Sequence, residues 1–164
     1  MIWLKTKVLE YYYIDKGAEA ADFSIGIFQM KPSFIEQLEA EVGKYEGLKK
    51  EYNSVLGFKT EQSKEIRKER LDRLKDKSWQ ITYINCFYDM MECKYSDTTF
   101  ATKEKKLQFY ASAYNHGFNC SAKEINKWIN IKSFPHGFGK KESKYCYAEV
   151  ALYFYKQLIE KKVL

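Results

Sequence analysis

The stretch from Lys77 to Tyr95, KSWQITYINCFYDMMECKY, carries the strongest core signal in this sequence of 164 residues. Its apolar side chains recur three and four positions apart, which places them on one face of a helix. A helix with a single apolar face buries that face against other elements. The stretch therefore predicts a core helix whose buried face comprises Trp79, Tyr83, Ile84, Phe87, Tyr88 and Met91.

The segments on both sides of this stretch also favour helices, because only two prolines and eight glycines interrupt the chain. No segment shows the alternation of apolar and polar residues that is typical of a strand. Helices are predicted over residues 2–15, 31–52, 59–76, 77–95, 102–116, 121–128 and 142–162, with loops at 18–30 and 131–141. The predicted fold class is mainly α, with a single domain over residues 1–164.

Residues 59–77 are dominated by charge, which predicts an exposed helix or a helical arm that runs into the next element. This segment contains charges of both signs, which favours a solvated helix whose own acidic and basic side chains pair with one another. The whole chain has 28 Lys and Arg against 22 Asp and Glu, a net charge of +6. That excess suits an anionic polymer, but a solvated lysine-rich surface is the favoured explanation. No RNA-binding, helix-turn-helix or zinc-finger pattern is present, so no nucleic acid partner is expected.

Hydrophobic residues make up 45% of the chain and charged residues 30%, which excludes a disordered protein. No apolar run approaches the roughly 20 residues that span a bilayer, so the chain is not expected to span a membrane. The first residues, MIWLKTKVLEYYY, contain charges within their apolar stretch and no small-residue cleavage site. They are therefore not expected to form a signal peptide.

The four cysteines Cys86, Cys93, Cys120 and Cys146 form no C-x-x-C pair, and both histidines lie far from the Cys86/Cys93 pair. The sequence therefore predicts no metal site and no cofactor. Cys86 and Cys93 are two helical turns apart, about 10 Å along the axis, which is too far for a disulfide. Buried thiols are expected instead.

Two segments interrupt the helical pattern with polar groups among small or apolar residues: residues 22–34 and residues 111–117. In the first, Ser24 and Gln29 can both donate and accept hydrogen bonds, as the neutral groups of a sugar-binding site do. The alternative is a tight turn in which Gln29 satisfies backbone groups. The alternative for the second segment is an ordinary helix end with Asn115 and Gly117.

Three segments resemble one known family. SIGIFQMKPSF (24–34) resembles the GLMQ-x-x-P stretch of the soluble lytic transglycosylases and goose-type lysozymes. ASAYNHG (111–117) is similar to their AAYNAG stretch, and YAEVALYFY (147–155) to the helix that closes their domain. The order and spacing agree over roughly residues 8–156. The resemblance implies a lysozyme-like helical domain.

The resemblance also implies an activity, cleavage of the β-1,4 bond between N-acetylmuramic acid and N-acetylglucosamine in peptidoglycan. One glutamate acts as general acid and then as base, and peptidoglycan or a related glycan is the partner. Gln29 and Met30 match the floor of the family's cleft. Tyr114 and Asn115 match groups beside the acid, and Tyr147 matches the late tyrosine that reaches it. The acid needs an apolar cleft, because desolvation raises the pKa of a carboxyl group.

Glu10 is the candidate acid, since it lies on a predicted helix 19 residues before Gln29. In the family the catalytic glutamate is followed by serine, whereas Tyr11 follows Glu10 here. Glu19 and Asp22 are further candidates, and the true acid lying upstream of Met1 is another alternative. A plain solvated carboxylate on an amphipathic helix is the remaining interpretation of Glu10.

Three function classes follow from these patterns. The first is a peptidoglycan-cleaving enzyme, located in the periplasm or cell envelope if the full gene encodes a signal peptide. The second is a non-catalytic lysozyme-like module that binds a glycan or a protein. The third is a helical adaptor that uses the charged segment 59–77. The family resemblance further predicts that Gln29 and Tyr114 lie in one cleft.

Overall fold

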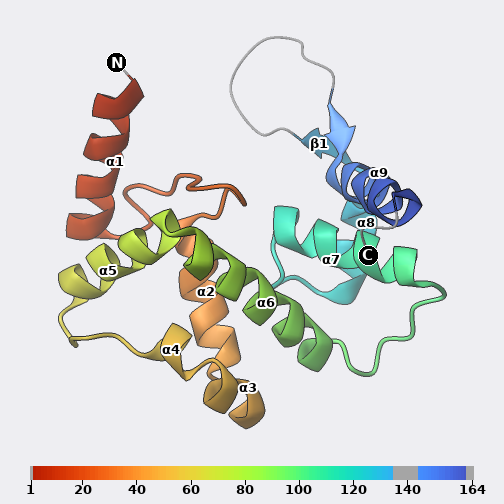
Figure 1. The fold of residues 1–164 in the computed structure, drawn as a ribbon, viewed down its shortest axis with the longest axis horizontal. Coiled ribbons are helices and arrows are strands. Elements are labelled where there is room, and N and C mark those ends of the chain that lie inside the picture. The colour runs from red at the N-terminus through yellow and green to blue at the C-terminus, as the bar shows by residue number, and fades with distance from the viewer. Residues whose placement is uncertain (1, 135–143, 162–164) are drawn as a thin grey trace. The chain divides into compact units, whose positions relative to one another are not determined.

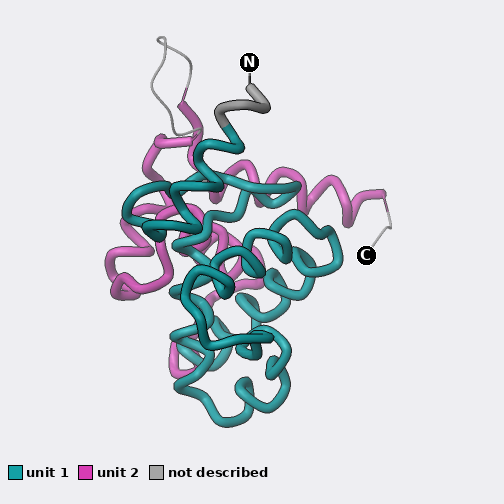
Figure 2. Tube along the Cα trace, turned by 90° about the vertical axis from the view of Figure 1, so that its left-hand side faces the viewer, with its two compact units in different colours: residues 1–94 teal, residues 95–164 magenta. Residues whose placement is uncertain are grey.

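The computed structural model describes residues 2–134 and 144–161 and divides the chain into two compact units (Figures 1 and 2). Unit 1 comprises Met1–Lys94 and unit 2 comprises Tyr95–Leu164. Helices make up most of the described residues, so the predicted mainly α fold class is confirmed. None of the described helices is long and apolar enough to cross a membrane.

Unit 1 is built around the predicted core helix. Its elements are α1 (Ile2–Lys16), α2 (Pro32–Val42), α3 (Glu46–Glu51), α4 (Asn53–Leu56), α5 (Ser63–Lys75) and α6 (Lys77–Lys94). Helix α6 packs against α2, α3 and α5, and α1 packs against α5. Tyr83, Phe87 and Met91 are buried as predicted, whereas Tyr88 is 49% exposed and Met90 is buried in addition. The buried face of α6 is therefore rotated slightly from the predicted one.

The predicted continuous helix 31–52 is interrupted in the structure. Helix α2 ends at Val42, Gly43 follows as its C-cap, and α3 begins at Glu46. Glycine has a low helix propensity, and Tyr45 adopts an extended conformation with φ −112° and ψ 109°. The chain consequently turns between two helices where the periodicity of the sequence predicted one.

Helix α5 forms within the charged segment, but one side of it is buried, which corrects the prediction of an exposed helix. Leu71 and Leu74 are fully buried, and the arginines at positions 70 and 73 are each 6% exposed. Arg70 donates to both carboxylate oxygens of Glu39, at 3.0 and 2.7 Å. Buried charges occur in proteins when they are paired in this way. The predicted pairing within the helix is present at Arg73 and Glu69, at 2.7 Å.

Unit 2 contains α7 (Lys103–His116), α8 (Ala122–Trp128), β1 (Lys132–Phe134), β2 (Tyr145–Cys146) and α9 (Tyr147–Glu160). Helix α7 packs against both α8 and α9, and β1 pairs antiparallel with β2. Phe109, Phe118 and Ile125 are fully buried and form its core.

The ends of the unit 2 helices follow local signals in the sequence. Thr102 caps α7 and Ser121 caps α8, each accepting a hydrogen bond from the backbone N–H three residues later. The predicted last helix begins at Tyr147 rather than at residue 142, because Tyr145 and Cys146 pair with β1. Residues 135–143, which include most of the predicted loop 131–141, lie outside the described residues.

Candidate functional site

The first family-like segment forms a tight turn after α1. Ile25 and Met30 exchange backbone hydrogen bonds of 2.8 and 3.1 Å. Between them the chain passes through the left-handed region at Gly26 (φ 73°) and again at Gln29 (φ 53°). Left-handed conformations are cheap for glycine but costly for residues with a Cβ atom. The sequence therefore places a glycine where this turn requires one.

Gln80 of α6 holds the turn in place. Its Oε1 accepts a hydrogen bond from Phe28 N at 3.1 Å, and its Nε2 donates to Leu74 O at 2.7 Å. A Cβ atom added at Gly26 would lie 1.6 Å from Gln80 Nε2. A side chain at position 26 would therefore require the Gln80 amide to move and to give up these hydrogen bonds.

The three predicted binding residues of this turn differ in accessibility. Ser24 and Gln29 are exposed, whereas Met30 is 1% exposed and belongs to the core. The structure therefore places Met30 inside unit 1 rather than on an accessible surface. Gln29 Nε2 donates to Gly26 O at 2.7 Å, so its amide satisfies a backbone group and leaves its carbonyl oxygen for other contacts.

Glu10, the candidate acid, is held between two lysines. Its Oε2 lies 3.2 Å from Lys7 Nζ and 3.0 Å from Lys75 Nζ, and its side chain is 12% exposed. Burial alone would raise the pKa of Glu10, but the hydrogen bonds and charges of Lys75 and Lys7 hold that pKa below its ordinary value. The carboxyl group is therefore ionised near neutral pH, the opposite of what a general acid needs.

The two further acidic candidates have other surroundings. Asp22 accepts hydrogen bonds from the backbone N–H and the hydroxyl of Ser33, at 3.0 and 2.8 Å. Its carboxylate thereby caps the first turn of α2. Glu19 is exposed in the loop after α1. Both residues are exposed, whereas the catalytic acid of such an enzyme lies in an apolar cleft.

In unit 2, the second and third family-like segments meet. The rings of Tyr114 and Tyr147 stack with their centroids 6.4 Å apart, and Phe134 packs edge-on against Tyr147 at 5.0 Å. Burial and the neighbouring Tyr147 raise the pKa of Tyr114, and burial raises that of Tyr147. Both phenols therefore stay protonated and can donate hydrogen bonds. Asn115, the next residue of α7, is half-buried.

The predicted site residues are thus divided between the units. Glu10, Ser24, Gln29 and Met30 belong to unit 1, and Tyr114, Asn115 and Tyr147 belong to unit 2. The common cleft for Gln29 and Tyr114 stays a prediction.

A further group of side chains was not found by sequence reasoning. Donor atoms of His116, Cys120 and Glu124 all lie within 4.8 Å of one another in unit 2. The expectation of no metal site was based on the absence of a C-x-x-C pair and on the separation of both histidines from Cys86 and Cys93. The signal that identifies this group is its spacing of four residues, His-x-x-x-Cys-x-x-x-Glu.

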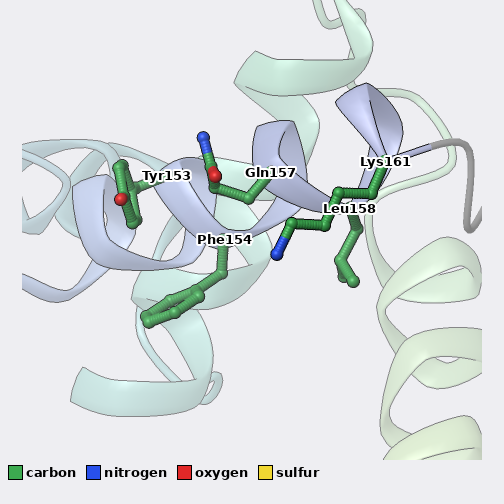
Figure 3. Close-up of a pocket in the computed structure, with 5 residues that line it drawn as sticks. All are labelled: Tyr153, Phe154, Gln157, Leu158 and Lys161. Atoms are coloured by element: carbon green, nitrogen blue, oxygen red, sulfur yellow. The ribbon is translucent and has the colours of Figure 1, made fainter.

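A shallow pocket of about 320 Å³ lies on α9 (Figure 3). Four of the five side chains that line it come from this helix, and the fifth belongs to the residue that directly follows it: Tyr153, Phe154, Gln157, Leu158 and then Lys161. None of them is a predicted site residue. Tyr153 and Phe154 are 60% and 61% exposed, so the pocket is an apolar surface rather than an enclosed cavity.

Comparison with known proteins does not extend these observations. The chain matches no protein-family model, no curated protein and no solved structure.

Proposed function

We propose that this chain binds a peptidoglycan-type glycan as a non-catalytic, lysozyme-like module. The glycan class follows from the resemblance of three segments to lytic transglycosylases and goose-type lysozymes. Two geometric features support it: the turn that presents Ser24 and Gln29, and the stacked pair of Tyr114 and Tyr147. Aromatic rings, hydroxyls and amides together are the groups that neutral sugars contact.

The protonation state of the Glu10 carboxyl group favours binding over cleavage. A general acid must hold a proton near neutral pH, which requires a raised pKa. Two lysine ammonium groups within 3.2 Å of Glu10 stabilise its charged form and lower its pKa instead. Glu10 therefore serves as an ion-pair partner that joins α1 to the end of α5.

Peptidoglycan cleavage is the second candidate. Its support is the position of Glu10 on α1, 19 residues before Gln29, together with the low exposure of its side chain, 12%. Cleavage through Glu10 requires Lys7 and Lys75 to leave the carboxylate when glycan binds. Burial would then be the dominant influence and would raise the pKa of Glu10.

Sedimentation with purified peptidoglycan, followed by chromatography of the supernatant, separates these functions. We expect the chain to co-sediment and to release no muropeptides. Gln29→Gly should weaken co-sedimentation roughly tenfold, the effect of losing about 1.4 kcal/mol of hydrogen bonding. Glycine is chosen because it suits the left-handed backbone at φ 53°, so the variant removes the side chain without adding strain.

Gln37→Ala is the matched control, because Gln37 is an exposed glutamine on α2. It should sediment like the unchanged protein. Release of muropeptides that Glu10→Gln abolishes would overturn the binding proposal in favour of cleavage. Absence of both co-sedimentation and release would contradict both candidates.

A further inference from the structure

We propose that unit 2 binds a zinc ion through His116, Cys120 and Glu124. Their donor atoms lie within 4.8 Å of one another, and His116 Nε2 is 3.6 Å from Glu124 Oε1. This group is independent of the proposed glycan contacts, since none of its members belongs to the family-like binding residues.

The three side chains are positioned by consecutive structural elements. His116 is the last residue of α7, and Gly117 turns the chain with φ 136°. Cys120 immediately precedes Ser121, the N-cap of α8, which places Glu124 in the first turn of that helix. The group therefore surrounds the short connection between α7 and α8.

Hydrogen bonds hold this connection together. Ser112 of α7 donates from Oγ to Ile125 O of α8 at 3.1 Å, in a buried position. The Tyr95 hydroxyl donates to Cys120 O, also at 3.1 Å. A metal site needs ligands on a fixed scaffold, because ordering them on binding costs conformational entropy. Here the backbone that carries the ligands is already tied in place.

The imidazole of His116 gives the strongest indication that a metal ion binds here. Its ring stacks on Trp128 with centroids 3.8 Å apart and an interplanar angle of 19°. Its Nε2 is buried and has no hydrogen-bond partner among the described residues. The 3.6 Å that separates Nε2 from Glu124 is too long for a hydrogen bond. A metal ion at this point would satisfy a nitrogen that burial otherwise leaves unpaired.

The donor set selects the metal. A thiolate, an imidazole and a carboxylate are the three side-chain types that bind Zn²⁺, at about 2.3, 2.0–2.1 and 2.0–2.2 Å. In a tetrahedron with such bonds, ligand atoms lie roughly 3.3–3.7 Å apart. The His116–Glu124 separation of 3.6 Å already agrees with this geometry. Rotation of the side chains would close the remaining distances, and water would fill the fourth position.

Unit 2 contains two cysteines, Cys120 and Cys146, and Cys120 is the one better suited to bind zinc. Cys146 is 2% exposed, and burial raises its pKa, which disfavours the thiolate that binds metals. Cys120 is half-buried and lies beside the imidazole. Zinc binding there would convert its thiol to a thiolate and release one proton per ion.

The test uses the full chain after chelator treatment and dialysis, titrated with Zn²⁺ and separately with Co²⁺. We expect one Zn²⁺ per chain, and with Co²⁺ a thiolate-to-cobalt charge-transfer band together with the visible bands of a tetrahedral site. Cys120→Ser should remove the charge-transfer band and weaken zinc affinity on the order of 100-fold or more, beyond the usual cost of altering an outer-shell partner.

Cys93→Ser is the matched control, because Cys93 is an exposed thiol of unit 1. It should leave the zinc affinity and the cobalt spectrum unchanged. Glu124→Gln provides a second ligand variant whose folding is secure, because Glu124 is exposed and its capping contact with Ser121 uses the backbone N–H. Equal zinc affinity in Cys120→Ser and the unchanged chain would overturn the proposal, as would loss of the cobalt band in Cys93→Ser.

Discussion

Glu10 illustrates at the scale of one residue how burial and neighbouring charge compete. Burial favours the neutral form of a carboxyl group, whereas an adjacent ammonium group favours the charged form. At Glu10 the ammonium groups of Lys7 and Lys75 prevail, and the pKa is lowered. Lys7 lies three positions away on the same helix, so its contact could be expected from the sequence. Lys75 lies at the end of α5, and only the tertiary fold brings it to Glu10.

Lys75→Met should raise the pKa of Glu10, because burial would then be opposed by Lys7 alone. A lowered folded-state pKa stabilises the protein above the ordinary pKa of a glutamate, and this stability is lost as the pH falls through the folded-state value. The variant should therefore lose stability at neutral pH and depend less on pH in the acid range. A ¹³C NMR titration of the Glu10 carboxyl group measures the pKa directly.

Lys68→Met is the control for this titration. Lys68 also lies on α5, but its ammonium group pairs with Glu65 at 3.9 Å rather than with Glu10. It should leave the Glu10 titration unchanged. An unchanged pKa in Lys75→Met would show that the contact between Lys75 and Glu10 does not persist in solution.

At the scale of one element, the turn 24–30 depends on a glycine and a distant glutamine. The Ile-Gly-Ile sequence indicates a turn, and the loop predicted over residues 18–30 is present. The role of Gln80 could not be predicted from the sequence. Gln80 lies on another element, and nothing in the pattern around it distinguishes it from any other polar residue of a helix. Two hydrogen bonds hold its side-chain amide in the space that a Cβ atom at Gly26 would need.

Gly26→Ala should lower the free energy of unfolding by about 2 kcal/mol or more. The left-handed φ of 73° costs an alanine about 1–2 kcal/mol, and the contact with Gln80 adds to that cost. In a double-mutant cycle with Gln80→Ala, the combined loss should be smaller than the sum of the single losses, because the second change removes the steric conflict. Urea denaturation measures all four proteins.

Gly47→Ala is a matched control for this cycle. Gly47 lies within α3, and nothing lies within 4 Å of the position that its Cβ atom would take. Alanine should stabilise the helix there by about 0.5–1 kcal/mol. Equal losses at positions 26 and 47 would contradict the structural account of the turn.

The helix ends were predictable where a side chain caps them or a glycine stops them. Thr102 and Ser121 accept the expected backbone hydrogen bonds, and Gly17 and Gly117 end helices with φ of 90° and 136°. The break at Gly43 was not predicted, because the apolar spacing continues across it. The strands β1 and β2 contain three and two residues, too few for alternation to be recognised.

At the scale of the whole molecule, the sequence predicts one domain because its length suits one and no linker composition divides it. The boundary between the units follows Lys94, and the polar stretch Ser96–Thr99 lies just beyond it. Such a stretch is typical of a simple turn between helices as well as of a domain boundary. The candidate site has the same ambiguity, since family-like motifs identify Tyr114 and Tyr147 as partners but not how their unit is placed relative to the turn 24–30.

A fragment of residues 1–94 should fold by itself. It contains its own buried side chains from four helices, among them Tyr13 of α1, Leu38 of α2, Leu71 of α5 and Met90 of α6. A chain of this length can bury well over half of the surface that its unfolded state exposes. We expect helical circular dichroism and a single cooperative transition in urea.

The fragment 95–164 should be marginal, because domains below about 70–80 residues seldom gain enough stability from one apolar core. Saturating Zn²⁺ should raise its unfolding midpoint, since an ion that binds only the folded state stabilises that state. The same addition should leave the fragment 1–94 unchanged, because the proposed ligands belong to unit 2. A fragment 1–94 without a cooperative transition would mean that its core requires residues 95–164. The single domain predicted from the sequence would then be the better description of the chain.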